Sequence, residues 1–412
     1  MCSAPSGLAL DASQARAVEL MLRARFALVT GPPGSGKTTT LRAALEAWGS
    51  GVRVALAAPT GKAARRMEQS TGRPAVTLHR LLGYRGGGFT VDQIDADVVV
   101  IDEASMIDYE LGLALLERLG RARLVLVGDA NQLPPVGPGR MFGDLVDAEA
   151  APVARLNTQH RARAESWVAR NAPAILEGGP IETEACAGFE WVQCANAGDI
   201  PTAVRDVLVG SGYQRGDRDP PMVLCPQRTG GAGCEAIAAA LDGVLNLEGP
   251  VAERGAAVLS RGPERMALRA GMRVIQTAND YDLGVMNGEL GWIVGIDAPG
   301  SGGVVRVEFP ELGDGETHYT RADAEALACA YALTVHKTQG SEFRHVVCVV
   351  HSTHTRMLSR SLLYTGVTRA KGRVTIVGDE KGLRRALKTD AAKRATTLVD
   401  RIAGTLDEVR GC

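Results

Sequence analysis

The stretch FALVTGPPGSGKTTTLRAALEAW, residues 26–48, joins an apolar run, a glycine-rich loop and a segment of helical periodicity. This order predicts a buried β-strand, a tight loop and a helix that begins where the loop ends. The loop GPPGSGKT, residues 31–38, matches the pattern G-x-x-x-x-G-K-[ST] in full. Backbone N–H groups of such a loop surround phosphate oxygens, and the helix N-terminus adds a favourable dipole. The stretch therefore predicts an α/β domain that binds a nucleoside triphosphate.

Two acidic residues follow a second apolar run, VVVIDEAS, at residues 98–105. Asp102 is suited to hold a Mg²⁺ shell together with the Thr38 hydroxyl, and Glu103 to orient and deprotonate an attacking water. Lys37 supplies a point charge to the β- and γ-phosphates. The residues expected to bind the nucleotide are Gly31, Pro32, Pro33, Gly34, Ser35, Gly36, Lys37, Thr38 and Thr39.

The composition is that of a globular protein of 412 residues, with 45% hydrophobic and 23% charged residues. Its length suggests two or three domains. The net charge of −1 provides no global basic field, so any nucleic acid must be held by local groups. The eight cysteines are scattered without a CxxC pair, and no leader-like or membrane-spanning apolar run is present. These features predict a soluble cytoplasmic protein with reduced thiols.

Further short apolar runs alternate with helical patterns and predict parallel sheets covered by helices. They are RVALAAP, DVVVID, RLVLVGD, PMVLCP, MRVIQT, HVVCVV and RVTIVGD. A loop-like join near residues 147–153 divides them, which predicts domains at 1–150 and 151–412. Two segments interrupt the alternation: a glycine-rich hairpin at about 83–96 in the first domain, and closely spaced strands at about 264–325 in the second. The latter predict a small β-barrel insertion.

Seven motifs then occur in one order along the chain: APTGKAARRM, TLHRLLG, VVVIDEASMI, VGDANQLPPVG, LNTQHRA, YALTVHKTQGSEF and TGVTRAKG. In the residues and the order of these motifs, the chain resembles superfamily 1 DNA helicases, most closely the RecD-type branch that includes RecD and Dda. The resemblance implies two RecA-like P-loop NTPase domains with ATP in the cleft between them. It also implies 5′-to-3′ movement on single-stranded DNA, in recombination, repair or replication, by a motor that we expect to be monomeric.

The same resemblance implies roles for individual residues outside the phosphate loop. Gln14 would contact adenine, and Gln132 in VGDANQLPPVG would sense the γ-phosphate. Arg161 and Arg369 would act as arginine fingers, which can be worth 10³ to 10⁵ in rate. ATP and Mg²⁺ are therefore the expected ligands of the motor.

A translocase is expected to contact the phosphates of the strand, because phosphate contacts do not depend on the base sequence. Polar residues in the motifs after several strands are the expected DNA contacts: Thr60, Lys62, Thr77, His79, Thr334, His336 and Lys337. Aromatic residues are scarce at 4%, which leaves few candidates for base stacking: Tyr84, Phe89, Trp292 and Phe343. The glycine-rich hairpin occupies the place of the family's duplex-splitting pin, so a duplex junction is an expected partner.

Other readings of the same residues stay open. One is an RNA helicase of the same superfamily, and another is a non-motor switch that clamps DNA when ATP is bound. A third is a helicase segment of a recombination nuclease or conjugative relaxase, with accessory recombination or replication proteins as partners. His351 and His354 have HxxH spacing but lack a third ligand nearby in the sequence, so we expect no metal site there.

Overall fold

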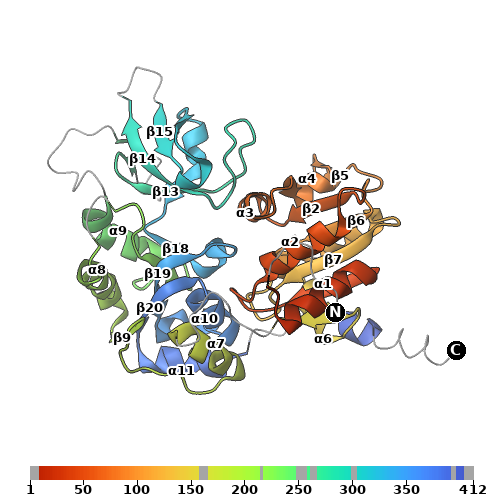
Figure 1. Cartoon of the computed structure of the whole chain (residues 1–412). Helices are drawn as coiled ribbons and strands as arrows, with labels where there is room; N and C mark the ends of the chain where they lie inside the picture. Colours follow the sequence, from red (N-terminus) through yellow and green to blue (C-terminus); the bar gives the residue numbers. More distant parts are fainter. Residues whose placement is uncertain are drawn as a thin grey trace. The chain divides into compact units, whose positions relative to one another are not determined.

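The computed structural model describes residues 9–156, 166–213, 217–246, 267–297, 304–390 and 396–402, and the backbone of 258–259. The chain forms two compact units, each with its own parallel sheet (Figure 1). The first unit comprises Met1–Glu165 and Ala392–Cys412, and the second comprises Ser166–Ala391. No helix in the described part of the chain is long and apolar enough to cross a membrane.

The first unit contains a six-stranded parallel sheet in the order β3-β2-β6-β7-β1-β8. Its strands are β1 (Phe26–Thr30), β2 (Val54–Ala58), β3 (Ala75–Thr77), β6 (Val98–Ile101), β7 (Arg123–Gly128) and β8 (Val153–Arg155). β1, β6 and β7 are buried along almost their whole length, because helices cover both faces of the sheet. All neighbouring strands are parallel, so the loops that follow β1, β6 and β7 emerge at the same edge.

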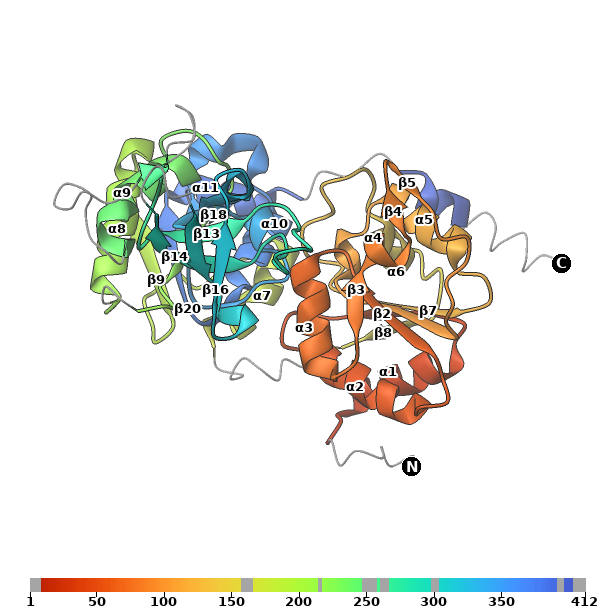
Figure 2. The ribbon, with the colours of Figure 1, turned by 90° about the horizontal axis from the view of Figure 1, so that it is seen from above.

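Two layers of helices cover this sheet (Figure 2). One face carries α1 (Ala12–Arg23), α2 (Lys37–Trp48) and α3 (Gly61–Thr71), and the other carries α4 (Leu78–Leu81), α5 (Tyr109–Arg118) and α6 (Met141–Asp147). A short 3₁₀ helix, η1 (Ala104–Met106), follows β6. Each face has its own apolar cluster, and the two clusters together form the core of the unit.

Polar side chains fix where several of these helices begin. Asp11 and Gln14 form a capping box at the start of α1, whereas Thr60 caps α3, Thr77 caps α4 and Asp108 caps α5. Each of these side-chain oxygens accepts a hydrogen bond from a backbone N–H that has no partner within its helix.

The predicted hairpin is confirmed as β4 (Tyr84–Arg85) paired antiparallel with β5 (Gly88–Phe89). Gly86 and Gly87 form its turn with φ of 56° and 87°, the left-handed region that glycine adopts without strain. Aromatic side chains anchor the hairpin to α4: the rings of Tyr84 and Phe89 lie 5.2 Å apart, and those of His79 and Tyr84 5.3 Å apart.

The boundary of the first unit differs from the predicted division at residue 150. β8 pairs with β1, which places residues 153–155 in the first sheet, and the compact units divide between Glu165 and Ser166. Residues 396–402 also belong to the first unit. The Tyr109 hydroxyl forms a hydrogen bond with Thr396, and Ile402 packs against the apolar cluster on that face. Such pairings between distant residues leave no local pattern in the sequence.

The second unit contains a five-stranded parallel sheet in the order β18-β10-β19-β20-β9. Its strands are β9 (Phe189–Gln193), β10 (Met222–Cys225), β18 (Ala332–Thr334), β19 (Phe343–Val350) and β20 (Ala370–Gly378). α8 (Ile200–Gly210) and α9 (Cys234–Leu245) lie on one face, and α7 (Trp167–Glu177), α10 (Arg360–Val367) and α11 (Glu380–Lys388) on the other (Figure 1). Three 3₁₀ helices connect these elements: η2 (Ala197–Asp199), η6 (Val335–Thr338) and η7 (Ser352–Met357).

An antiparallel sheet is inserted between α9 and β18, as predicted, but its bounds differ from the expectation. Its order is β16-β15-β14-β13-β17, with β13 (Arg273–Gln276), β14 (Leu290–Ile296), β15 (Val305–Glu308), β16 (Glu316–Tyr319) and β17 (Leu327–Cys329). The predicted antiparallel insertion is confirmed, and among the described residues it is a five-stranded sheet whose edge strands β16 and β17 do not pair with each other. The stretch MRVIQT supplies β13 of this sheet rather than a strand of a parallel one.

Shorter elements complete the insertion. β11 (Val258–Leu259) and β12 (Leu268–Arg269) form a two-stranded ribbon before the sheet. The 3₁₀ helices η4 (Pro310–Leu312) and η5 (Asp323–Ala326) lie after β15 and before β17. The inserted sheet and the parallel sheet share one apolar cluster, which makes the insertion an integral part of the second unit.

Candidate active site

The loop between β1 and α2 is shaped to receive phosphate. Gly34 and Gly36 have φ of 80° and 83°, which favours glycine at both positions. A Cβ on Gly31 would lie 2.7 Å from the Ser35 Oγ and 2.8 Å from the Leu156 carbonyl oxygen, so a side chain is excluded there too. The loop ends at the N-terminus of the 12-residue helix α2, where backbone N–H groups and the helix dipole favour an anion.

Lys37 lies in the first turn of α2 and points back over this loop. Its Nζ donates hydrogen bonds to the carbonyl oxygens of Gly31 at 2.7 Å and Pro32 at 3.0 Å. Pro33, Thr38 and Thr39 are half-buried beside it. The ammonium group is therefore held at the phosphate loop by the loop itself.

Gln14 links helix α1 to the phosphate loop. Its Oε1 accepts a hydrogen bond from the Asp11 N–H at 3.1 Å, and its Nε2 donates to the Ser35 carbonyl oxygen at 3.4 Å. The side chain is 3% exposed. Gln14 thus lies beside the phosphate loop.

Asp102 and Glu103 follow β6 at the same edge of the sheet. The Glu103 N–H donates to the Asp102 Oδ1 at 2.8 Å, and Glu103 has φ of 51°, a conformation that costs energy for any residue other than glycine. The pKa of Asp102 is raised to about 6, chiefly because its carboxyl group is withdrawn from water and secondly because Glu103 is close. The Lys37 ammonium opposes this rise.

The loop after β7 brings Asp129 and Gln132 to this edge, on the strand between β1 and β6. Asp129 is 1% exposed and holds the turn: its carboxylate accepts from the Asn131 N–H at 3.0 Å and from the Gln132 Nε2 at 3.3 Å. Gln132 is 7% exposed, so its amide is fixed by a buried carboxylate rather than directed freely into solvent.

Three buried polar side-chain atoms at this edge have no hydrogen-bond partner among the described residues. They are the Ser35 Oγ after β1, the Ser105 Oγ after β6 and the Gln132 Oε1 after β7. A buried polar atom without a partner costs about 1–3 kcal/mol, and such atoms mark places where a ligand or solvent completes the bonding. Because all three follow neighbouring strands at one edge of the sheet, this edge is a candidate polar binding site.

The donors at this edge fit a Mg²⁺ ion. Asp102 offers a carboxylate, and Thr38, in the first turn of α2, offers a hydroxyl with no hydrogen bond among the described residues. Hard cations of this size prefer carboxylate, hydroxyl and water oxygens. A divalent cation would also stabilise the ionised form of Asp102, which burial and the nearby Glu103 disfavour.

Arg369 is the strongest candidate for catalysis in the second unit. It is 2% exposed, its Nε donates to the Thr365 carbonyl oxygen at 3.1 Å, and its Nη1 donates to the Ser341 carbonyl oxygen at 3.3 Å. Its Nη2 is buried without a partner among the described residues. The guanidinium is therefore pre-oriented, with the N–H groups of its Nη2 unused among the described residues. Arg161, the other expected arginine finger, lies outside the described residues.

The expected DNA contacts of the first unit follow β2 and β3. Thr60 and Thr77 use their hydroxyls as helix caps, accepting from the Ala63 and Arg80 N–H groups at 3.2 Å each. Thr77 is only 5% exposed, whereas Lys62 is half-buried and His79 is exposed. All of them follow the carboxyl ends of their strands, on the same edge of the sheet as the phosphate loop.

The second unit carries the remaining expected contacts after β18. Thr334 precedes η6 and is half-buried, His336 is half-buried and Lys337 is exposed. Two of the aromatic candidates are buried instead of available for stacking. Trp292 is 2% exposed, with the Arg273 guanidinium 5.8 Å from its ring, and Phe343 is 6% exposed.

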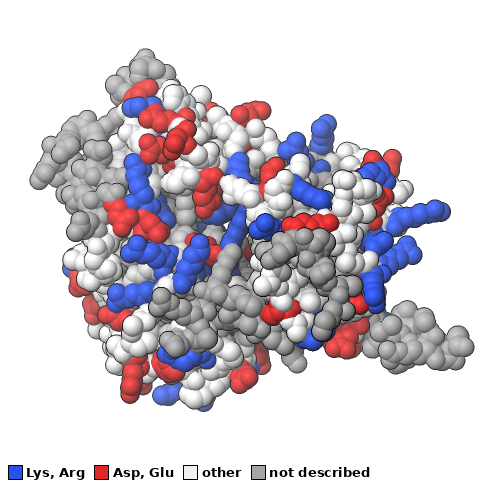
Figure 3. All heavy atoms as spheres, viewed as in Figure 1, with Lys and Arg blue, Asp and Glu red and all other residues white. Residues whose placement is uncertain are grey.

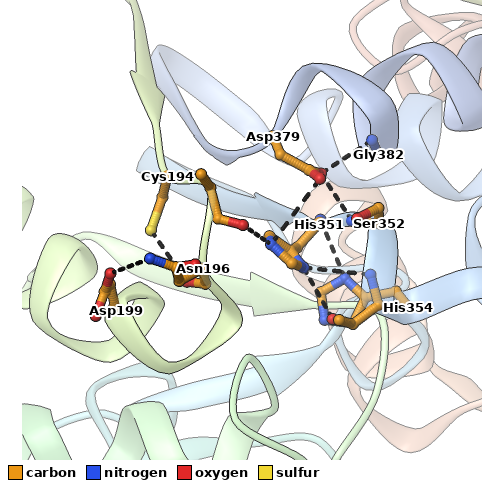
Figure 4. A network of polar contacts seen from close by, with 10 residues as sticks. Cys194, Asn196, Asp199, His351, Ser352, His354, Asp379 and Gly382 are labelled. Atoms are coloured by element: carbon orange, nitrogen blue, oxygen red, sulfur yellow. Dashed lines mark hydrogen bonds and ion pairs between the residues drawn. The ribbon is translucent and has the colours of Figure 1, made fainter.

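Sequence reasoning missed a polar network at the carboxyl edge of the second sheet (Figure 4). The His351 Nε2 lies 3.1 Å from the Ala195 carbonyl oxygen. The His354 Nδ1 accepts from the His351 N–H at 3.2 Å, so its Nε2 carries the proton that bonds the Ala232 carbonyl oxygen at 3.2 Å. Burial lowers the pKa of His354. The HxxH spacing therefore serves to join loops after three strands, and only the fold reveals it.

Two family models match the chain. Residues 9–197 match the AAA domain, and residues 329–377 match the UvrD-like helicase C-terminal domain. The first match contains the phosphate loop, the acidic pair and Gln132. The second contains Arg369 and the residues after β18.

Characterised relatives cover almost the whole chain. The ATP-dependent RecD2 DNA helicase of Deinococcus radiodurans is 35% identical over 407 residues, which cover 95% of this chain and 52% of the relative. The RecBCD enzyme subunit RecD of Mycobacterium tuberculosis is 33% identical over 444 residues, which cover 95% of this chain and 73% of the subunit. The chain thus spans about half the length of the first relative and about three quarters of the second.

Solved structures of Pif1 helicases share the fold. One, from work on the unwinding of forked duplex DNA by two coordinating Pif1 helicases, has a TM-score of 0.60 at 21% identity and covers 97% of this chain and 98% of its own. Pif1 from Candida albicans has a TM-score of 0.57 at 17% identity and covers 97% of this chain and 100% of its own. Because the RecD subunit is 33% identical over most of both chains, this chain belongs to the RecD family of superfamily 1 helicases.

Proposed function

We propose that this chain is an ATP-dependent DNA helicase that moves 5′-to-3′ on single-stranded DNA, in recombination, repair or replication. The observation that carries the proposal is the convergence of Lys37, the Asp102–Glu103 pair and Gln132 at one edge of the first sheet. The relatives support it: RecD2 is an ATP-dependent DNA helicase, and Bacteroides Pif1 has been solved bound to single-stranded DNA.

Each residue of the site has a proposed part in ATP hydrolysis. The backbone of the phosphate loop and Lys37 bind the phosphates, and Gln14 contacts the adenine. Thr38 and Asp102 hold Mg²⁺, which neutralises charge on the phosphate oxygens. Glu103 orients the attacking water and takes its proton. Gln132 senses whether the γ-phosphate is attached, because its Oε1 is buried beside the loop without another partner.

Arg369 is the proposed arginine finger. Two backbone carbonyls fix its guanidinium, and the buried Nη2 is the donor left for a phosphate oxygen. Because only guanidinium offers this fixed fork, Arg369→Lys should lose nearly as much turnover as Arg369→Ala. Arg161 remains a proposed second finger.

The DNA-contacting residues are proposed to grip phosphates from both units. Charge or N–H donors come from Lys62, His79, His336 and Lys337. Short polar groups at the ends of parallel strands come from Thr60, Thr77 and Thr334. The hairpin of β4 and β5 is proposed to separate the strands at a duplex junction. Its exposed Tyr84 is the ring available to stack on a base.

One assay in two parts tests this function. ATP turnover is measured alone, with single-stranded DNA and with single-stranded RNA, and duplexes tailed at the 5′ or 3′ end are then offered for unwinding. We expect stimulation by DNA, unwinding of 5′-tailed duplex only, no turnover in Lys37→Ala, and ATP binding without turnover in Arg369→Ala. Turnover indifferent to both nucleic acids rejects the motor. Stimulation by RNA alone favours the RNA helicase, and unwinding of only 3′-tailed duplex reverses the polarity.

A second candidate is a motor subunit within a larger recombination machine, which the match to the RecD subunit of RecBCD favours. A motor that acts alone should be a monomer of 43.3 kDa in light scattering and should unwind without additions. DNA-stimulated turnover combined with a complete lack of unwinding would favour the subunit, whose partner proteins would then be needed for strand separation.

A further inference from the structure

Four arginine side chains line one hollow on the surface of the first unit. Arg23 is the last residue of α1, Arg25 precedes β1, Arg121 precedes β7, and Arg123 is the first residue of β7. The hollow has a volume of about 500 Å³, and within the described part of the chain these four residues line it. Figure 3 shows Lys and Arg side chains projecting from the edge of this unit. We call this feature the arginine hollow.

The arginine hollow lies at the opposite edge of the sheet from the phosphate loop. β1 and β7 run parallel with Phe26 beside Leu124, so the arginines gather at the amino ends of both strands. The phosphate loop follows Thr30, at the carboxyl end of β1. The first and last residues of the five-residue strand β1 lie roughly 13 Å apart, at about 3.3 Å for each step from one residue to the next. The expected DNA contacts Thr60 and Thr77 lie at the carboxyl ends of β2 and β3, on the same edge as the phosphate loop. The hollow is therefore separate from both the nucleotide site and the expected DNA contacts of this unit.

The charges in the hollow are poorly compensated within the described part of the chain. The Arg23 Nη1 lies 2.8 Å from the Glu19 Oε1, and the Arg123 Nη1 donates to the Leu22 carbonyl oxygen at 2.6 Å. The exposed guanidinium groups of Arg25 and Arg121 form no hydrogen bond or ion pair with described residues. Four like charges with one carboxylate repel one another, and a bound anion relieves that repulsion.

Two acids in an adjoining depression are already paired with another arginine. Asp95 and Asp97 line this depression together with Arg121 and Arg123, and both form ion pairs with Arg53. The Arg53 Nη2 donates to the Asp97 Oδ1 at 3.0 Å. These pairs hold the pKa of Asp97 below its usual value, as a carboxylate already matched to a guanidinium should be. The hollow therefore keeps its positive charge in a chain whose net charge is −1.

The chemistry of the lining favours nucleic-acid phosphates over a protein partner. Protein interfaces depend on apolar and aromatic anchors at their centre, and the arginine hollow contains neither. Backbone phosphates need only charge and guanidinium forks, and they release counterions when bound. We propose that the arginine hollow is a second phosphate-binding site for nucleic acid, remote from the ATP site, which holds a segment of a longer or branched substrate.

This proposal rests on the proposed function for the identity of the polyanion, and the experiment separates the two. The double variant Arg25→Gln/Arg121→Gln removes the two guanidinium groups that have no partner among the described residues. The control Arg42→Gln/Arg385→Gln removes the same charge from exposed positions on α2 and α11. Fluorescence anisotropy across a salt series measures affinity for a forked duplex and for a strand of roughly six nucleotides, a length that one site can hold.

We expect the double variant to bind the fork about ten-fold more weakly at low salt, with a salt slope smaller by about 1–2, as for two lost phosphate contacts. Binding of the short strand and its stimulation of ATP turnover should stay unchanged, and the control should match the wild type. Equal weakening for fork and short strand, or an equal effect of the control, would overturn the proposal. Unchanged fork affinity together with binding of polyglutamate to the hollow would assign it to an acidic protein. Wild-type protein that binds neither DNA overturns both proposals.

Discussion

The backbone N–H of Glu103 donates a 2.8 Å hydrogen bond to the carboxylate of Asp102, and Glu103 itself is held at φ 51°. The bond and the left-handed turn together fix the backbone where two adjacent carboxyl groups follow β6. We propose that Asp102 holds a cation and that Glu103 activates water. The backbone strain is confined to Glu103, so its effect on the free energy of unfolding can be measured separately from the effect of the side chain on ATP turnover.

Replacing Glu103 separates backbone strain from chemistry. Glu103→Gly should unfold with a free energy about 1 kcal/mol higher than Glu103→Ala, because glycine adopts positive φ freely. Both variants, and Glu103→Gln, should lose at least about 100-fold in ATP turnover while binding ATP. Glu149 has φ of 46° outside the site, so Glu149→Gly is the matched control, stabilised with normal turnover. Turnover retained in Glu103→Gln would remove Glu103 from the reaction.

The raised pKa of Asp102 predicts a pH-dependent effect on stability. Because the folded-state pKa of about 6 exceeds the ordinary 3.8, the folded chain keeps a proton that the unfolded chain has lost between these values. The carboxyl group therefore stabilises the fold at low pH and loses that contribution as the pH rises through about 6. Without divalent cations at pH 7, Asp102→Asn should raise the free energy of unfolding by about 1–2 kcal/mol.

Urea unfolding of the wild type and Asp102→Asn in EDTA, at pH 7 and near pH 4, measures this difference. The difference in free energy of unfolding between the variant and the wild type should shrink towards pH 4, because the Asp102 carboxyl group of the folded wild type is then protonated and neutral, like the asparagine side chain. Addition of Mg²⁺ with ATP should stabilise only the wild type. An Asn variant that is less stable than the wild type at pH 7 contradicts the unfavourable charge at Asp102.

The close packing around Gly31 predicts a costly substitution. In Gly31→Ala the new Cβ would meet the Leu156 carbonyl oxygen at 2.8 Å and the Ser35 Oγ at 2.7 Å, so β8 and the phosphate loop must move apart. We expect a loss of about 1–3 kcal/mol in the free energy of unfolding, with weaker ATP binding. Gly51→Ala, where nothing lies within 4 Å, is the control and should change stability by less than about 0.5 kcal/mol. Equal effects of the two substitutions would disprove the packing argument.

Gln132 is predicted to couple ATP hydrolysis to DNA. Gln132→Ala removes the amide fixed by Asp129 and should leave the Kd for ATP within about two-fold, since the phosphate loop is intact. DNA-stimulated turnover and unwinding should both fall by about 10-fold or more. The exposed neighbour Asn131 bonds Asp129 through its backbone alone, so Asn131→Ala should behave as wild type. Normal stimulation and unwinding in Gln132→Ala would exclude the sensor role.

The nucleotide site could be predicted because its parts are local in sequence. Residues 31–38 form the phosphate loop between a strand and a helix wherever the rest of the chain goes, and Asp102 and Gln132 each follow an apolar strand directly. Parallel strands place their carboxyl ends on one edge, so three local patterns become one site. The order of the strands and the unused bonds of Ser35, Ser105 and Gln132 could not be inferred this way.

By itself, the sequence determined the α/β class, the phosphate loop, the acidic pair and the alternation of strands with helices, because short-range periodicity and turn chemistry set them. Only the tertiary structure decided that β8 and residues 396–402 join the first unit. It alone brought Arg23 and Arg25 to Arg121 and Arg123, about a hundred residues away along the chain. The physical reason is that strand pairing and charge crowding depend on which distant segments meet, and no local pattern records that choice.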